Sequence, residues 1–184
     1  MKIGKLFVIS GPSGVGKNTV INELLKINNN ISLSISCTTR NPREGELDGT
    51  NYFFLSKTDF QHKIEKGEFL EWAVFNENYY GTRQKYVEEC LNNGKDLILE
   101  IDVQGAIQIK KKLPDAHLIF ILPPSIKTLE NRLKGRGTED NKTIKKRLNI
   151  AKEELKNTDK FDYFIVNDDL LYSTKQLNKI ISEQ

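Results

Sequence analysis

A glycine-rich turn between an apolar run and an amphipathic stretch constrains this chain more than any other feature. Leu6–Ile9 is a continuous apolar run, typical of a strand that is covered on both faces. Residues 11–18, GPSGVGKN, follow it and match the P-loop spacing GxxxxGK[ST] except at the last position. Beyond the turn, Val20, Ile21 and Leu24 share one helical face. This order, in which a strand is followed by a glycine-rich turn and then by the start of a helix, predicts a loop whose backbone N–H groups bind phosphate.

Two residues at the end of this loop bear on catalysis and metal binding. Lys17 is expected to reach the β- and γ-phosphates of a nucleotide, so it is a candidate catalytic residue. Asn18 stands where Ser or Thr normally places a hydroxyl group on Mg²⁺, and it is a candidate metal ligand. Because Mg²⁺ keeps several waters and binds substrate phosphates, nucleotide binding does not depend on this one ligand. The expected nucleotide-binding residues are Gly11, Pro12, Ser13, Gly14, Val15, Gly16, Lys17, Asn18 and Thr19.

Three further apolar runs predict buried strands at 97–101, 118–122 and 164–166. Helical segments are expected at 105–113 and 172–181, so strands alternate with helices along the chain. This alternation requires crossover connections and therefore predicts an α/β fold, with a parallel sheet flanked by helices.

We expect a single domain in which two segments interrupt this alternation. Residues 33–94 carry many turn signals and scattered aromatic residues, which predict an inserted β-rich lobe with one or two helices. We call this segment the second lobe. Residues 125–160, rich in Lys, Arg, Glu and Asn, predict mobile helices joined by a loop. The core of the domain would then comprise residues 1–32, 95–124 and 161–184.

Composition and charge exclude several classes of protein. With 38% hydrophobic and 29% charged residues and a mean hydropathy of -0.51, the 184-residue chain is predicted to be neither a membrane protein nor wholly disordered. A net charge of +3 indicates no bulk attraction to nucleic acid. Cys37 and Cys90 lack CxxC spacing, which predicts a reduced compartment and no zinc site. The N-terminal apolar run is too short for a signal peptide, so we expect a cytoplasmic protein.

A second candidate site lies in the second lobe, within the sequence TTRNPREGELDGTNYFF at 38–54. Arg40 and Arg43, three residues apart in a turn-rich stretch, offer forked donors, and Tyr52 adds a hydroxyl group. Together they predict a site for an anion such as a phosphate group. A charged surface loop is the alternative that these residues alone leave open.

This segment and the P-loop together resemble the guanylate kinase family, and the resemblance covers almost the whole chain. It continues through FLEWA, NYYGT, EIDVQG, LPPS, RLKGRGT and IVNDD, which begin at residues 69, 78, 100, 122, 132 and 165. The resemblance implies an enzyme that moves the γ-phosphoryl group of ATP to GMP or dGMP, with Mg²⁺ as cofactor and as a monomer or homodimer. It also implies that the second lobe binds GMP and that residues 125–160 form a helical lid.

The resemblance implies two groups of GMP-binding residues in the second lobe and the adjoining core. The GMP phosphate would be bound by Arg40, Arg43, Tyr52 and Tyr80. The guanine ring would be surrounded by Ser36, Glu71, Thr82 and Asp102. Asp102 also ends an apolar run, where an acidic residue can bind Mg²⁺ through a water molecule.

The polar segment and the last strand supply the remaining candidates. Arg132, Arg136 and Arg147 resemble the lid arginines of the family, which would act on the reacting phosphates together with Lys17. A solvated helix face is the alternative for them, because Lys and Arg are frequent here. Asn167 follows the last strand and resembles the segment that lines the adenine pocket.

Two other functions remain open at this point. A non-catalytic module of the same fold could bind phosphorylated peptides, but such modules generally have an eroded P-loop, whereas Lys17 is present here. A kinase for another nucleoside monophosphate would need different base-reading residues. A GTPase switch is disfavoured because no NKxD sequence stands at the expected place.

Overall fold

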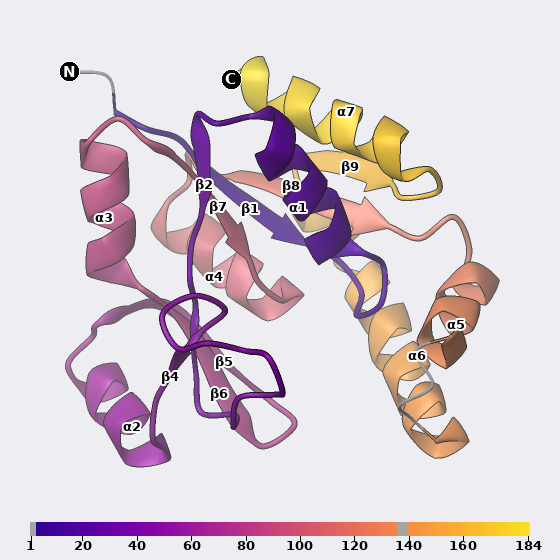
Figure 1. Ribbon diagram of the computed structural model, residues 1–184, viewed down its shortest axis with the longest axis horizontal. Coiled ribbons are helices and arrows are strands. Elements are labelled where there is room, and N and C mark those ends of the chain that lie inside the picture. Colours follow the sequence, from indigo (N-terminus) through magenta and orange to yellow (C-terminus); the bar gives the residue numbers. More distant parts are fainter. Residues whose placement is uncertain (1–2, 136–139) are drawn as a thin grey trace.

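The computed structural model describes residues 3–135 and 140–184 (Figure 1). Its larger sheet has the strand order β2-β7-β1-β8-β9, and every neighbouring pair is parallel. These strands are β1 (Leu6–Ser10), β2 (Ile31–Leu33), β7 (Asp96–Glu100), β8 (His117–Leu122) and β9 (Tyr163–Val166). The predicted α/β fold with a parallel sheet is confirmed. The three-residue strand β2 was not predicted, because so short a run gives no periodic signal.

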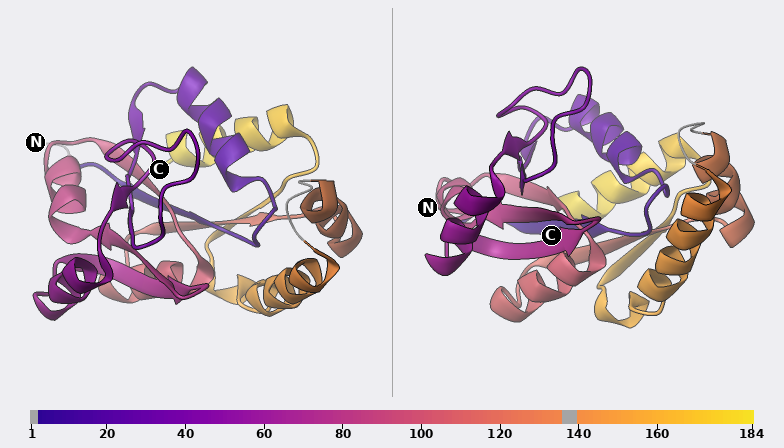
Figure 2. Two further views of the ribbon diagram at one scale, coloured as in Figure 1. Left: turned by 60° about the horizontal axis from the view of Figure 1, so that its bottom comes forward. Right: turned by 90° about the horizontal axis from the view of Figure 1, so that it is seen from below.

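Helices cover both faces of the large sheet, as the continuous apolar runs require (Figure 2). One face packs against α1 (Lys17–Ile27) and α7 (Leu170–Ser182), and the other against α3 (Gln84–Asn92) and α4 (Val103–Lys112). In β1, Phe7 points to the first of these layers, whereas Val8 points to the second. Both side chains are fully buried, so the strand is fixed at the centre of the domain.

The second lobe contains a four-stranded sheet with the order β4-β3-β6-β5. Its strands are β3 (Cys37–Thr38), β4 (Phe53–Phe54), β5 (Phe69–Phe75) and β6 (Asn78–Arg83), accompanied by α2 (Lys57–Glu65). Phe60 of α2 stacks on Phe69, with 4.3 Å between the ring centroids, and forms a small separate core. Helix α3 lies within the segment predicted as the second lobe, residues 33–94, but its Val87 packs into the core of the large sheet.

The polar segment forms α5 (Ile126–Gly135) and α6 (Asn141–Leu155), followed by the short helix η1 (Thr158–Lys160). Leu129 and Leu133 of α5 pack with Ala151 of α6 in a core of their own. Helix α5 also contacts the P-loop: a Cβ atom on Gly14, whose φ is 88°, would lie 2.7 Å from Leu133 Cδ2. Across the ranges that the structure describes, no helix combines the length and the apolarity that a membrane crossing requires.

Candidate active site

A cleft of about 830 Å³ opens at the carboxyl ends of β1 and β7, between the second lobe and α6. In Figure 1 the second lobe lies at the lower left of the molecule and the helix pair α5–α6 at the lower right. The structure brings many of the predicted site residues to the lining of this cleft: Gly11, Ser13, Lys17, Ser36, Tyr52, Glu71, Tyr80 and Asp102. Residues from the P-loop and from the second lobe, far apart in the sequence, therefore face one common space.

The P-loop turns sharply from β1 into α1. Gly11 has a φ of 143°, and a Cβ atom there would lie 2.3 Å from the carbonyl oxygen of Ile121, so only glycine fits. Helix α1 begins at Lys17, and Lys17 Nζ donates to the carbonyl oxygen of Gly11 at 2.7 Å. The lysine ammonium group is thus held over the loop. Asn18 and Thr19 are exposed on the first turn of α1 and do not line the cleft.

Arg132 and Asn167 support the loop from its outer side. Arg132 donates to the carbonyl oxygen of Val15 at 3.1 Å and to that of Asn167 at 2.8 Å. The buried side chain of Asn167 donates to the same Val15 oxygen at 2.8 Å. In this structure the Arg132 guanidinium therefore binds backbone carbonyl groups and joins α5, the P-loop and the segment after β9.

Helix α6 contacts the P-loop through residues on one of its faces. Arg147 donates to Ser13 Oγ at 2.5 Å. Glu154 lies two turns further along the same face and lines the cleft. Burial raises the pKa of Glu154 to about 7, although the charge of Lys17 and a backbone hydrogen bond from Ser13 act in the opposite direction. Arg136, the other predicted lid arginine, lies outside the described residues.

The second lobe holds a buried carboxylate at its end of the cleft. Glu71 of β5 is only 3% exposed, and its Oε1 accepts a hydrogen bond from Thr82 Oγ1 at 2.6 Å. Burial raises the pKa of Glu71 to about 7, and the nearby charge of Asp102 acts in the same direction. Asp102 caps the N-terminus of α4, where its Oδ1 accepts from Gly105 N at 2.7 Å. Ser36 completes this part of the lining.

The predicted phosphate-binding residues form a cluster beside this carboxylate. Arg40 donates through both terminal nitrogens to Glu46, at 2.9 Å each, and its guanidinium lies 5.4 Å from the Tyr52 ring centroid. The rings of Tyr52 and Tyr80 meet edge to face at 6.2 Å. Arg43 contributes its backbone N–H to Glu46 at 2.7 Å, while its side chain is exposed. Arg40, Tyr52 and Tyr80 are thus brought together, and Arg43 stands at their edge.

The family model for guanylate kinase matches residues 3–184 of the chain. The chain belongs to the guanylate kinase family. It is 53% identical over 184 residues to the guanylate kinase of Clostridioides difficile (strain 630), covering 100% of this chain and 90% of that protein. The guanylate kinase of Synechocystis sp. (strain ATCC 27184 / PCC 6803 / Kazusa) is 50% identical over 181 residues, covering 98% and 95%. The predicted resemblance is confirmed, and with it the prediction of an enzyme, a kinase.

Solved structures agree with this membership of the guanylate kinase family. The crystal structure of guanylate kinase from Anaplasma phagocytophilum superposes with a TM-score of 0.82 at 32% identity, covering 99% of this chain and 86% of that one. A gluconokinase from Sinorhizobium meliloti 1021 gives a TM-score of 0.54 at 12% identity, covering 100% and 94%. The second likeness concerns the fold alone.

One prediction about this guanylate kinase family member is wrong: Asp102 does not end a strand. β7 ends at Glu100, and Asp102 lies two residues later as the cap of α4. The strand was predicted to reach residue 101 because Ile101 is apolar, which hid the strand-final carboxylate of Glu100. Burial raises the pKa of Glu100, and the charge of Lys17 opposes that shift. Glu100 and Lys17 both line the cleft.

Three acidic residues of the site were missed in the sequence. Glu100 carried a signal, since it is the last residue of the strand next to the P-loop strand. Glu154 carried a weaker one, its spacing of seven residues from Arg147 on a predicted helix. Glu46 stands three residues after Arg43, but nothing in the sequence indicated that it pairs with Arg40.

Proposed function

We propose that this member of the guanylate kinase family transfers the γ-phosphoryl group of ATP to GMP, or to dGMP. One observation supports the proposal above all others. A single cleft has a P-loop with its lysine at one end and, at the other, the buried carboxylate of Glu71 beside the Arg40 cluster. The first end suits a nucleoside triphosphate, and the second suits a nucleotide that carries both a phosphate and adjacent ring donors.

The acceptor base would be recognised by Glu71. Guanine presents two neighbouring donors, N1–H and the 2-amino group, and an ionised carboxylate presents two acceptors at matching spacing. Adenine has an unprotonated N1 and no 2-amino group, so it would leave the buried carboxylate of Glu71 partly unpaired, with Thr82 as a partner but no donor from the base. Ser36 and Thr82 would bind the remaining edges of the ring through hydroxyl groups, which can both donate and accept, and the Asp102 carboxylate would accept from a ring donor.

The acceptor phosphate would be bound by Arg40, Arg43, Tyr52 and Tyr80. Arg40 uses one N–H of each terminal nitrogen for Glu46, and Nη1 also donates to the carbonyl oxygen of Asn41 at 2.7 Å, so these bonds use three of the five guanidinium N–H groups. Its remaining donors leave it able to bind a second anion. The exposed side chain of Arg43 could approach the same anion from the solvent side of the loop.

On the donor side, the P-loop backbone from Gly11 to Gly16 would bind the β- and γ-phosphates of ATP, with Lys17 as their charge partner. Asn167 would line the adenine pocket. The carboxylates of Glu100 and Asp102 line the same cleft as Lys17, and such oxygens suit a hydrated Mg²⁺ ion. When bound with ATP, the ion would supply neutralisation of phosphate charge.

The transfer itself needs alignment and charge neutralisation rather than acid-base chemistry. The GMP phosphate oxygen is already an anionic nucleophile, so no general base is required. Arg132, Arg136 and Arg147 would come onto the transferring group when the lid closes, and closure would exclude water that could otherwise hydrolyse ATP. In the described structure Arg147 already reaches Ser13 of the P-loop.

A coupled assay of ADP formation with GMP, dGMP, AMP and UMP tests the proposal. We expect GMP and dGMP to be phosphorylated with a kcat/KM at least about 100-fold above that for AMP and UMP. Lys17→Met protein, purified in parallel, controls for contaminating kinases. A preference for AMP or UMP would assign the enzyme to another acceptor, and ADP formation with none of the four would favour the phosphopeptide-binding module.

A further inference from the structure

Gly105, in the first turn of α4, touches both carboxylates at the second-lobe end of the cleft. Its backbone N–H donates to Asp102 Oδ1 at 2.7 Å. A Cβ atom built on Gly105 would lie 2.6 Å from Glu71 Oε2 and 3.3 Å from Glu71 Cδ. The glycine is itself buried. A side chain at this position would therefore collide with the carboxylate of Glu71.

The backbone does not account for glycine here. Gly105 lies inside a regular helix and is not among the residues with positive φ. At such a position alanine forms a helix more readily than glycine does. The three atoms nearest to a Cβ atom at this position are Oε2 and Cδ of Glu71 and Cδ1 of Ile101, the last at 3.2 Å. The lack of a side chain at residue 105 thus leaves room for the Glu71 carboxylate.

Glu71 has little room to yield to an added methyl group. Its Oε1 is bound to Thr82 Oγ1 at 2.6 Å, and the two residues are paired across strands β5 and β6. Strand β5 is also fixed to α4, because Gln108 donates to the carbonyl oxygen of Trp72 at 2.9 Å. An alanine at 105 must therefore displace the carboxylate, α4, or both.

We propose that Gly105 is a positioning residue that sets the base preference of the acceptor site. Its bare Cα lets the Glu71 carboxylate lie against the first turn of α4, and its N–H fixes the Asp102 carboxylate one turn earlier. One residue thereby holds the two carboxylates in a fixed relation to each other. This inference rests on the proposed function, in which Glu71 binds the guanine ring.

The test is Gly105→Ala, measured with GMP and AMP against the wild-type enzyme. We expect kcat/KM for GMP to fall at least about tenfold, chiefly through KM, with a smaller loss for AMP, so that the preference narrows. Lys111→Ala is the matched control, because it places an alanine at an exposed position of the same helix, α4. That control should stay within about twofold of the wild type.

A double variant separates positioning from general damage to the fold. Glu71→Asp shortens the side chain by one methylene group and withdraws the carboxylate from residue 105. In that background Gly105→Ala should cost less than about threefold, and any loss of Tm that it causes alone should be relieved. Equal costs in both backgrounds, equal losses for GMP and AMP, or wild-type kinetics in Gly105→Ala would each overturn the inference. Failure of the proposed function would show separately, as a wild-type enzyme without preference for GMP.

Discussion

At the P-loop end of the cleft, the proposed phosphate-binding groups are mostly backbone N–H groups, whereas at the second-lobe end the proposed GMP-binding groups are side chains held by other side chains. The P-loop has its shape because Gly11 turns where no other residue fits. In the second lobe, Glu71 is held by Thr82, and Arg40 is held by Glu46. Backbone geometry of the first kind has a sequence signature. Side-chain pairing of the second kind has no sequence signature. We also expect single substitutions to affect the two ends of the cleft differently.

This difference sets the expected effects of substitution at the two ends. On the proposed function, a lost charge at the P-loop would remove an interaction with the reacting phosphates themselves and would therefore lower kcat. A lost holding residue in the second lobe leaves the binding group present but less well oriented, so it mainly raises KM for the acceptor. The four variants below test this division, beginning with the largest expected effect.

Lys17→Met should abolish most of the activity by removing the charge at the P-loop end of the cleft. Its ammonium group, held at 2.7 Å from the Gly11 carbonyl oxygen, would become the charge partner of the phosphates. We expect kcat/KM to fall at least about 100-fold, near 3 kcal/mol, with an unchanged circular dichroism melt. Lys26→Met on the exposed side of the same helix is the control. More than about a tenth of wild-type activity in Lys17→Met would remove the lysine from this role.

Arg147→Ala should lower kcat by about 30-fold and change the Kd of GMP by less than about threefold. The reason is its place beside Ser13 of the P-loop, far from the Arg40 cluster. Steady-state kinetics and GMP titration by calorimetry give the two quantities. The neighbouring exposed Lys146, replaced by Ala, provides the control. Weak GMP binding with normal turnover would place Arg147 at the acceptor end instead.

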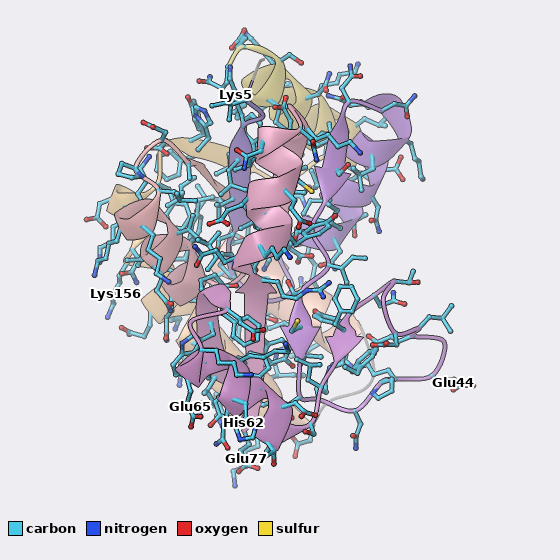
Figure 3. All side chains as sticks on the ribbon, turned by 90° about the vertical axis from the view of Figure 1, so that its left-hand side faces the viewer. Lys5, Glu44, His62, Glu65, Glu77 and Lys156 are labelled. Atoms are coloured by element: carbon cyan, nitrogen blue, oxygen red, sulfur yellow. The ribbon has the colours of Figure 1, made fainter. Side chains whose placement is uncertain are left out.

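Glu46→Gln should affect the second-lobe end alone. The carboxylate binds Arg40 through two hydrogen bonds of 2.9 Å, so its loss leaves the guanidinium less well fixed. We expect KM for GMP to rise about fivefold to tenfold with kcat nearly unchanged. Glu44→Gln removes the same charge from the outer tip of the loop, where Glu44 points away from the molecule (Figure 3). A similar effect of both variants would mean that only net charge matters.

Asn18→Ser should have the smallest effect. Asn18 is exposed on the first turn of α1 and does not line the cleft, so we expect turnover within about twofold of the wild type. Titration of activity with Mg²⁺ should show at most a modest gain in metal affinity. A large gain would mean that Asn18 compromises the metal site, and a complete loss would assign the amide a role of its own.

The same contrast explains how much of the fold could be predicted from the sequence. Strands β1, β7 and β8 are buried on both faces, so they are continuous apolar runs, and their alternation with helices indicates a parallel sheet. β2 has three residues and β3 and β4 have two each, too few for a periodic pattern. They are strands because neighbouring strands offer them partners, which is a tertiary effect.

In the candidate site, the sequence predicted many of the residues that the structure brings to the cleft, but not how their side chains are supported. The P-loop and the paired arginines follow from spacing and chemistry within one segment. Three other features depend on contacts between separate turns or elements. They are the pairing of Glu46 with Arg40, the close approach of Glu71 to Gly105, and the place of Glu154 in the cleft lining. Such contacts depend on packing that a single sequence does not display.

Protonation of Glu71 links the stability of the fold to pH. Burial raises the pKa of this carboxyl from 4.5 to about 7, so between these values the folded protein binds more protons than the unfolded chain. Its contribution to stability is therefore present below pH 4.5 and lost as pH rises through 7. Glu71→Gln cannot ionise at this position. As pH rises from 5 to 8, its free energy of unfolding should therefore increase by about 1–3 kcal/mol relative to that of the wild type. Urea unfolding of both proteins at the two pH values measures this difference.

The most direct test of the account is the ratio of kcat/KM for GMP to that for AMP, measured at pH 8 in the wild type and in Glu71→Gln. At this pH the wild-type carboxylate is ionised and can accept from both guanine donors, whereas the amide of the variant turns a donor toward one of them. We expect the variant to lose at least about tenfold with GMP and less with AMP, so that the ratio narrows. Equal losses with both nucleotides would contradict the account, because Glu71 would then support the second lobe without reading the base.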